Sequence, residues 1–204
     1  MQRALIALCA MLLFSTCLMA TEEPEYTVIQ KTDTYEVRQY RPYLVAETLV
    51  EADIDDAGNE AFRILAGYIF GKNKSKTKME MTAPVITEES EKIEMTAPVT
   101  SSGGEGRYLY QFVMPARYTL ETLPEPEDDR VILREVPGRV LAVRTFSGFW
   151  SEDRFAKEEA RLRDDLSRDD LTVLGEASLS RYNSPFTLWF LRRNEIWFPV
   201  DLQQ

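Results

Sequence analysis

Stretches in which apolar and polar residues alternate recur along the chain and predict a sheet. Alternation with a period of two is typical of half-buried strands, and turn-forming residues separate one stretch from the next. The strands expected on this basis are 26–31, 35–40, 44–52, 108–114, 131–135, 139–146, 179–182 and 195–200. A turn is expected at the glycine-rich residues 101–106 and a loop at 123–129. The sheet is expected to be mostly antiparallel.

Two segments break this alternation and follow a helical period instead. The first helix is expected to have Asp55 or Asp56 as its cap and to end at Gly71. Its apolar residues have the spacing of an ordinary buried stripe, formed by Ala61, Ile64, Leu65, Tyr68 and Ile69. The second helix is expected to start at Ser151, and it carries a narrower stripe of Phe155, Leu162 and Leu166.

A weak internal duplication relates the two helical segments. The sequence LVAET at 44–48 is loosely matched by LAVRT at 141–145, and each of these strands precedes one of the helices. The predicted fold class is therefore α+β, a mostly antiparallel sheet in two pseudo-repeated halves that each carry one α-helix.

A phrase of seven residues occurs twice, fourteen positions apart. Residues 79–85 read MEMTAPV, and residues 93–99 read IEMTAPV. Each copy alternates up to a proline, which cannot donate a hydrogen bond to a ladder, and a polar segment at 87–91 separates the copies. We therefore expect a hairpin whose strands end at a sheet edge or bulge. The alternative is that two strand ends have similar packing needs.

Longer motifs around this phrase point to a family. FRILAGYIFGKN at 62–73 precedes the phrase, and YQFVMP at 110–115 and RYNSPFTLWFLRRNE at 181–195 follow it. With these motifs in this order, the chain resembles the SOUL haem-binding family from about Tyr26 to Val200. The resemblance implies a distorted antiparallel β-barrel with two helices, which binds haem or another tetrapyrrole in an apolar cleft.

The first twenty residues predict export. Arg3 precedes an uninterrupted apolar stretch at 4–14, which is short for a membrane span, and acidic residues follow the leader. We expect a signal peptide that is cleaved after Ala20, leaving a single domain over 21–204. A lipoprotein anchored at Cys17 is the alternative. Either form is exported, and in a Gram-negative cell it is expected to be periplasmic.

Composition restricts the chemistry. Both cysteines, Cys9 and Cys17, lie in the leader, and the chain of 204 residues contains no histidine. A processed protein of this composition has no Ser-His or Cys-His nucleophile and no imidazole or thiolate metal site, so carboxylate catalysis is the form that remains. We expect a binding protein and not an enzyme. The net charge of −10 argues against nucleic acid and anionic lipid as partners, and we expect a monomer.

The first helix has more apolar surface than core packing requires. Beside the buried stripe, Phe62, Ala66 and Phe70 form a second row, with Asn59 one turn upstream. In the family the tetrapyrrole cleft lies against this helix, and the resemblance implies that Asn59, Phe62 and Ala66 face the cleft. The alternative is that the row covers the open side of the barrel.

Haem commonly takes a histidine ligand, which this chain cannot supply. The remaining axial candidates are a tyrosinate or the thioethers of Met79, Met81, Met95 and Met114. Weak binding does not require ligation, because burying roughly 400 Å² of macrocycle at ~25 cal/mol/Å² gives ~10 kcal/mol, of which at least ~4 kcal/mol is lost on association. The remainder corresponds to a dissociation constant on the order of tens of micromolar. We therefore predict binding of haem or another tetrapyrrole without an axial histidine.

A series of lysines directly follows the first helix. Lys72, Lys74, Lys76 and Lys78 alternate in an otherwise acidic chain, and as a set they could receive the propionates of a tetrapyrrole. The alternative is that they are solvated and complement the C-terminus of the helix.

Glu195 suits a second class of ligand. The SOUL fold is similar to that of bacterial effector-binding domains, in which an acidic group inside the pocket matches a cationic drug. The resemblance implies that Glu195 could play that part for cationic or neutral apolar molecules, which is the alternative function. The alternative is that Glu195 has a structural role and forms an ion pair with the adjacent Arg192 or Arg193.

Overall fold

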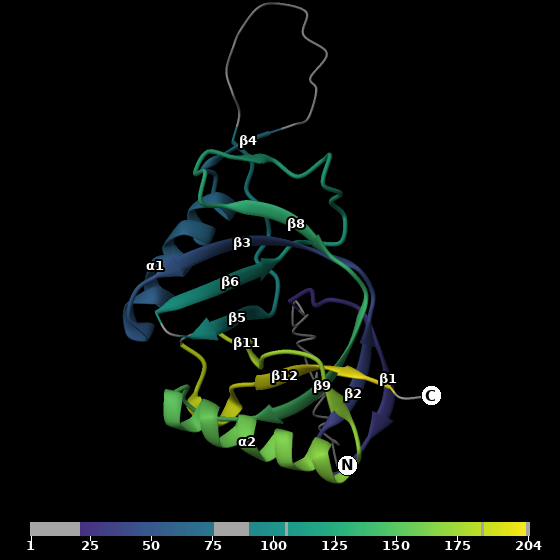
Figure 1. Ribbon diagram of the computed structural model, residues 1–204. Coiled ribbons are helices and arrows are strands. Elements are labelled where there is room, and N and C mark those ends of the chain that lie inside the picture. Colours follow the sequence, from purple (N-terminus) through teal and green to yellow (C-terminus); the bar gives the residue numbers. More distant parts are fainter. Residues whose placement is uncertain (1–20, 76–89, 105, 185, 203–204) are drawn as a thin grey trace, which may run out of the picture.

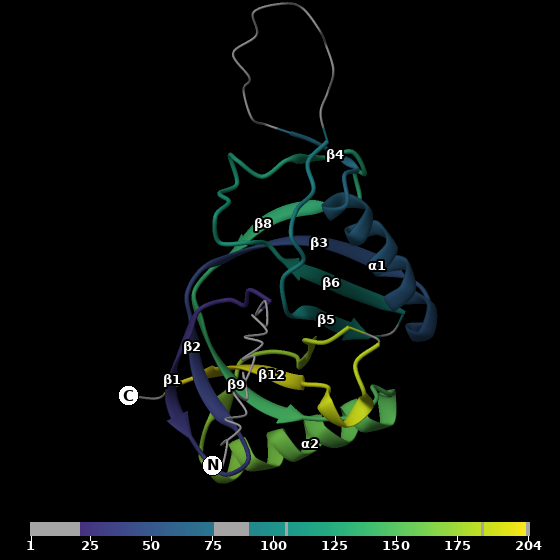
Figure 2. The same ribbon diagram turned by 180° about the vertical axis from the view of Figure 1, so that it is seen from behind.

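A ten-stranded antiparallel sheet, curled into a half-barrel, organises the computed structural model (Figures 1 and 2). The structure describes residues 21–75, 90–104, 106–184 and 186–202. The strand order is β1-β2-β9-β12-β11-β5-β6-β3-β8, and β10 pairs with β12 beside this path. The strands are β1 Tyr26–Lys31, β2 Glu36–Tyr40, β3 Tyr43–Glu51, β5 Val99–Gly104, β6 Arg107–Val113, β8 Ile132–Val136, β9 Arg139–Phe146, β10 Thr172–Val173, β11 Ser178–Arg181 and β12 Asn194–Asp201. The predicted α+β class with an antiparallel sheet is confirmed.

Two helices cover one face of this sheet. Helix α1, Ile54–Ile69, packs on β3 and β6, and helix α2, Glu152–Arg168, packs on β9 and β12. Tyr110 belongs to the core under α1 and Ile196 to the core under α2. These two residues belong to one cross-strand row, which places both helices on the same face. Among the described residues, no helix has the length and apolar character needed to cross a bilayer.

The buried stripes of both helices are those expected from their sequences. On α1 the five predicted stripe residues are all buried, and on α2 Leu162 and Leu166 are buried while Phe155 packs at the margin. Strands β3 and β9, which contain the two copies of the loosely repeated pentapeptide, each lead into a helix. The arrangement of the two halves is therefore the one that the weak duplication predicts.

Helix α1 begins earlier than predicted. The backbone amides of Asp56 and Ala57 donate to the carbonyl oxygen of Asp53 at 3.0 and 2.9 Å, so the helix starts at Ile54. The predicted cap, Asp55 or Asp56, is therefore wrong, because both residues already lie in the first turn. Asp53 occupies the cap position without a hydrogen bond from its side chain.

The other predicted helix boundaries are confirmed. Helix α1 ends at Ile69, and Gly71 follows with a φ of 118°, a left-handed conformation that glycine adopts without steric cost. At the start of α2, the amide of Arg154 donates to the hydroxyl oxygen of Ser151 at 3.2 Å. This hydrogen bond is the N-cap expected from the sequence.

The second copy of the repeated phrase is not a strand. Residues 93–98 are irregular, and the amide of Ala97 donates to the carbonyl oxygen of Glu22 at 2.9 Å. Strand β5 begins only at Val99. The hairpin prediction is therefore wrong for this copy, because its backbone bonds to the N-terminal segment and not to a paired strand. The first copy, residues 79–85, lies outside the described residues, as do the predicted leader and its cysteines.

The glycine-rich segment predicted as a turn is mostly a strand. Strand β5 runs through it and pairs with β6 on one side and with β11 on the other. Ladder hydrogen bonds on both sides stabilise a strand that the propensities of Ser and Gly disfavour. The loop predicted at 123–129 carries the two-residue strand β7, Glu125–Pro126, which pairs with β4, Asn73–Lys74.

Candidate functional site

A cavity of about 420 Å³ lies where α1 passes over the middle of the sheet. Helix α1 forms one wall, strands β5, β6 and β11 form the floor, and the turn before α2 closes one end. The lining residues are Gly58, Asn59, Phe62, Val99, Ser101, Tyr110, Gly148, Trp150, Leu179, Arg181, Asn183, Arg192 and Asn194. This volume and this mixture of aromatic and polar groups are typical of a small-molecule site.

Strand register explains why residues far apart in sequence form one floor. Side chains alternate between the faces of a strand, so residues that pair directly across the sheet share a face. Two neighbouring rows supply the floor, one of Tyr110, Ser101 and Leu179, and the other of Val99, Arg181 and Asn194. Both rows lie at the seam between the α1 half and the α2 half of the sheet.

Arg181 dominates the electrostatics of this cavity. Its side chain is partly buried, and no hydrogen bond or ion pair joins its guanidinium to any of the described residues. Burial lowers the pKa of Arg181, but an arginine in a protein remains charged. A charge that is removed from water costs free energy unless it is paired. The position therefore favours a ligand that brings a negative group to Arg181.

The rest of the lining is consistent with an anionic, apolar ligand. Arg181 and Arg192 are the charged residues of the lining, and no Asp or Glu belongs to it, although the chain carries a net charge of −10. Phe62, Tyr110 and Trp150 provide aromatic surface. Burial raises the pKa of Tyr110, so its phenol is a neutral donor and not a tyrosinate.

The structure brings two of the predicted helix residues to this cavity. Asn59 and Phe62 line it from adjacent positions on α1. Ala66 is buried and Phe70 is exposed, and neither lines the cavity. Lys72 lines a separate small cavity of about 130 Å³ at the end of α1. Whether any of these residues contacts a ligand stays a prediction.

Glu195 lies on the opposite face of the sheet from the cavity. It pairs with Ser180 of β11, whereas the cavity residue Arg181 pairs with Asn194. The alternation of side chains along both strands therefore points Glu195 away from α1. Its side chain is only 1% exposed.

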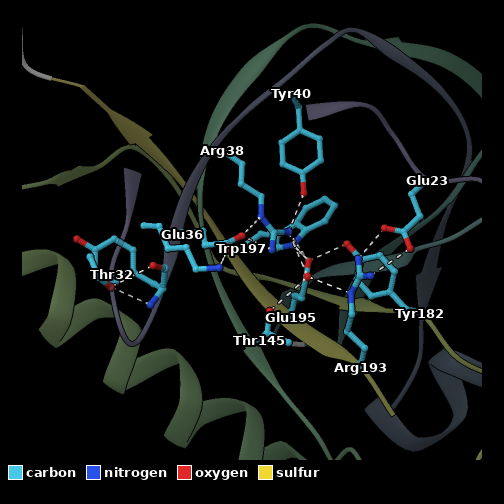
Figure 3. A network of polar contacts seen from close by, with 12 residues as sticks. Glu23, Thr32, Glu36, Arg38, Tyr40, Thr145, Tyr182, Arg193, Glu195 and Trp197 are labelled. Carbon is cyan, nitrogen blue, oxygen red and sulfur yellow. Dashed lines mark hydrogen bonds and ion pairs between the residues drawn. The ribbon is translucent and has the colours of Figure 1, made fainter. Parts of the chain in front are cut away.

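Five side chains hold the buried carboxylate of Glu195 (Figure 3). Arg38 Nη1 and Arg193 Nε lie 3.1 and 3.2 Å from Oε1, so the ion pair with an adjacent arginine is formed. The remaining donors are Tyr182 Oη at 2.7 Å and Trp197 Nε1 at 2.8 Å from Oε2, and Thr145 Oγ1 at 3.4 Å from Oε1. The carboxylate is thus fully hydrogen-bonded by the protein itself.

The same network ties the N-terminal segment to the sheet. The second guanidinium nitrogen of Arg193 lies 2.6 Å from Glu23, and Arg38 lies 2.8 Å from Glu36 (Figure 3). Burial alone would lower the pKa of Arg38, but the charge of Glu195 raises it above its ordinary value. Glu195 therefore has a structural role at the centre of an ion-pair chain.

A larger cavity of about 660 Å³ lies between the N-terminal segment and the connection after β6. Its carboxylates are Glu22, Glu23, Glu25, Glu121 and Glu135, and its basic residue is Arg41. This acidic lining suits an anionic ligand poorly. The smaller cavity beside α1 is the better candidate for a ligand site. Its arginines and its aromatic side chains both complement an anionic, apolar molecule.

The structure offers no axial sulfur at the candidate cavity from the methionines that it describes. Met95 is exposed in the irregular segment before β5, and Met114 is buried and lines the larger cavity. Met79 and Met81 lie outside the described residues. Among the described residues there is also no cluster of three or more His, Cys, Asp or Glu that could hold a metal ion.

Sequence reasoning did not single out Arg181, Tyr110 or Trp150. A signal for Arg181 was present, since it lies two positions after the apolar Leu179 on a predicted strand and therefore shares its buried face. An arginine on the apolar face of a strand indicates either an ion pair or a ligand. The contribution of Trp150 depends on how the turn before α2 folds, which local sequence does not determine.

The fold belongs to a class of antiparallel α+β modules. The C-terminal domain of EcmrR has a TM-score of 0.58 against this chain, with 10% sequence identity, over 86% of this chain and 98% of that domain. A similarity at this level of identity establishes the fold alone.

The chain belongs to the SOUL heme-binding protein family, whose family model matches residues 21–199. Heme-binding protein 2 of Mus musculus is 30% identical over 185 residues, which cover 87% of this chain and 85% of that protein. Heme-binding protein 1 of Xenopus tropicalis is 26% identical over 170 residues, which cover 80% and 82% of the two chains. The resemblance seen in the sequence motifs is confirmed.

Proposed function

We propose that this protein binds haem or a related tetrapyrrole in the cavity beside α1 and catalyses no reaction. The observation that carries the proposal is Arg181, a charged group that has no hydrogen bond or ion pair among the described residues and lies in a cavity with aromatic walls. A tetrapyrrole combines the two features that this cavity would match, a flat apolar ring and carboxylates at its edge. Membership of a family whose named relatives are heme-binding proteins supports the same ligand class.

Each part of the lining would have a distinct task. Phe62, Tyr110 and Trp150 would cover the ring, and Arg181 would pair with a carboxylate through hydrogen bonds worth roughly 1.5–3 kcal/mol. Asn59 would bond to the polar rim. A bound iron would supply redox and ligand-exchange chemistry, but the cavity residues described here bind the porphyrin and not the metal.

A cationic ligand, the alternative function, receives less support. No carboxylate belongs to the lining of this cavity, and Glu195 is held by two arginines on the other face of the sheet. A positively charged molecule in the cavity would also be repelled by Arg181. A hydrophobic cation is therefore expected to bind weakly, and it serves as the negative control in the titrations that follow.

Absorbance titrations of the purified protein test the proposal. The probes are protoporphyrin IX, its dimethyl ester, which lacks free carboxylates, and a hydrophobic organic cation. We expect Arg181→Met to weaken binding of protoporphyrin about 10- to 100-fold, since one charge-assisted interaction is lost. Binding of the dimethyl ester should be nearly unaffected. The matched control is Arg41→Met, which removes the arginine of the larger cavity and should change neither titration.

Three results would contradict the proposal. The first is no binding of protoporphyrin by the wild-type protein, and the second is tighter binding of the cation than of either porphyrin. The third is a loss of affinity in Arg41→Met that equals the loss in Arg181→Met, which would place the ligand in the larger cavity.

We also propose that the protein acts after export as a monomer in the periplasm. The leader sequence and the single predicted domain support this proposal. Intact mass of the protein recovered from the cell envelope tests it. A chain that begins at Thr21 is expected, whereas a diacylglyceryl mass on Cys17 would show a membrane-anchored lipoprotein.

A further inference from the structure

The connection between β11 and β12 presents a run of exposed apolar side chains. Phe186 is 93% exposed, and four further residues of the run are more than half exposed, namely Leu188, Trp189, Phe190 and Leu191. Singly exposed apolar residues are normal on a soluble protein, but several large ones in sequence usually mark a contact surface. Residues 186–191 are called the aromatic tip below.

The local geometry of the aromatic tip spreads its side chains in different directions. Trp189, Phe190 and Leu191 form a short 3₁₀ helix, in which successive residues point about 120° apart. The rings of Trp189 and Phe190 are 5.6 Å apart and cross at 86°, so they do not stack face to face. A flat protein surface could cover only one of these directions. A fluid apolar phase that surrounds the tip can cover all of them.

The charges around the aromatic tip follow the order of a bilayer interface. The tip itself contains no ionisable side chain, and Arg192 directly follows it. The guanidinium of Arg192 lies 4.8 Å from the ring of Phe149, another exposed aromatic residue at the base of the tip. Arginines commonly lie at headgroup depth while neighbouring aromatic and aliphatic side chains enter the acyl region.

The aromatic tip also adjoins the candidate cavity. Asn183 and Arg192, which flank the tip in sequence, belong to the cavity lining. In both views of the ribbon, the connection between β11 and β12 lies beside the first turn of α2, where Gly148 and Trp150 close the cavity (Figures 1 and 2). A surface that covers the tip would therefore lie next to the cavity.

From these observations we infer that the aromatic tip inserts into the surface of a phospholipid bilayer. The contact is peripheral, apolar insertion drives it, and the net charge of −10 makes a zwitterionic surface the suitable one. Docking would hold the cavity at the membrane, where apolar molecules partition. The inference does not depend on the proposed function, because the tip would bind lipid with or without a tetrapyrrole in the cavity.

Flotation of the processed protein with phosphatidylcholine vesicles, in the absence of any porphyrin, tests the inference. The wild-type protein should float with the vesicles, and binding should persist at about 0.5 M NaCl because apolar contacts are not screened. The triple variant Phe186→Ser, Trp189→Ser and Leu191→Ser should bind at least about tenfold more weakly. Brominated lipid should quench tryptophan fluorescence in the wild-type protein and much less in Trp189→Phe.

A matched pair of single variants separates insertion from general stickiness. Leu191 in the tip and Leu174 outside it are each 62% exposed. Leu191→Ser should reduce vesicle binding, and Leu174→Ser should not. Thermal melts verify that every variant is folded.

The inference is overturned if the wild-type protein stays at the bottom of the gradient, or if Leu174→Ser loses as much binding as Leu191→Ser. It is also overturned if sedimentation shows a dimer that the triple variant disrupts while vesicles remain unbound. That last result would assign the tip to a contact between two copies of the chain.

Discussion

Arg181 and Glu195 lie on opposite faces of the β11–β12 pair, because Arg181 pairs with Asn194 and Glu195 pairs with Ser180. The two opposite charges therefore do not contact each other. Glu195 is held by protein donors on its own face, while Arg181 faces the cavity without a protein partner among the described residues. Substitutions at these two positions should consequently separate fold stability from ligand binding.

Removing the charge of Arg181 should stabilise the unliganded protein. A partly buried guanidinium without a partner opposes folding, so Arg181→Met should raise the free energy of unfolding by roughly 0.5–2 kcal/mol. Urea denaturation measures this change. Arg134→Met is the control, since Arg134 lies 2.8 Å from Glu47 and its loss should destabilise the protein. If Arg181→Met lowers stability as Arg134→Met does, then Arg181 has a structural partner and our view of the cavity is wrong.

Neutralising Glu195 should have the reverse effect. Glu195→Gln leaves Arg38 and Arg193 facing a neutral amide, and loss of one partner from a buried ion pair typically costs roughly 3–5 kcal/mol. Porphyrin affinity should stay within about threefold of wild type under conditions in which the variant is folded. Glu25→Gln, which breaks an exposed pair with Arg41, should cost less than about 1 kcal/mol. A selective loss of porphyrin affinity in Glu195→Gln would show that this face of the sheet binds the ligand.

A bulky side chain in the cavity should block binding without disturbing the core. Ser101 lies on the cavity floor, so Ser101→Trp should abolish porphyrin binding and change the melting temperature little. Ala66 is buried and outside the cavity, so Ala66→Trp should cost roughly 1–3 kcal/mol through overpacking. The opposite pattern, in which Ala66→Trp blocks binding at no cost in stability, would place the ligand further along α1.

Iron should contribute little to affinity. The chain has no histidine, and neither Met95 nor Met114 lines the cavity. Protoporphyrin IX should therefore bind within about tenfold of hemin, a difference of ~1.4 kcal/mol. Titrations of both porphyrins decide the question. A much stronger preference for hemin that one Met→Leu variant among Met79, Met81, Met95 and Met114 removes would establish thioether ligation.

Stability should fall in acid because paired carboxylates become protonated. Burial alone would raise the pKa of Glu47, but hydrogen bonds from Arg134 and Gln111 lower it below its ordinary value. Hydrogen bonds from the Arg130 side chain and backbone lower the pKa of Asp128 to about 2. Since both pKa values are lower in the folded state, the stability that these groups add is complete above their unfolded pKa values, 4.5 and 3.8, and is lost as pH falls through the folded ones.

Urea denaturation at about pH 6 and about pH 3 measures this loss. Glu47→Gln should be less stable than wild type at about pH 6 and should lose less on acidification, because position 47 no longer titrates. A wild-type protein whose unfolding free energy is higher at about pH 3 than at about pH 6 would contradict the assignment.

The sequence pattern correctly predicted those elements whose structure depends on interactions between neighbouring residues. The stripe on α1, the cap at Ser151 and the left-handed Gly71 each follow from the chemistry of a few neighbouring residues. Strand β5 was missed because its Ser and Gly residues favour a turn, and only the pairing of both its edges stabilises the extended form. The irregular second copy of the repeated phrase was missed for the same reason, since its hydrogen-bond partner at Ala97 is the distant Glu22.

The residues of the candidate site likewise divide into those that local sequence predicts and those that depend on strand register. The helical period places Asn59 and Phe62 side by side on α1, and the family resemblance implied that both face a cleft. The sequence contains a signal that Arg181 shares the buried face of Leu179, but its place in the cavity depends on the register that sets β11 beside β5. Glu195 could be recognised as important, but a one-residue difference in register decides which face it occupies. Sequence pattern alone does not specify that register.

Strand β12 occurs last in the described chain, yet it lies in the middle of the sheet between β9 and β11. The path from the α2 half to the α1 half runs through it, so the two halves cannot join until Asn194–Asp201 is available. A ribosome or a secretion channel that still holds these residues would therefore keep the sheet incomplete, whatever has already emerged. Such an order of assembly would suit the export proposed above, because the step that closes the half-barrel waits for the last strand of the described chain.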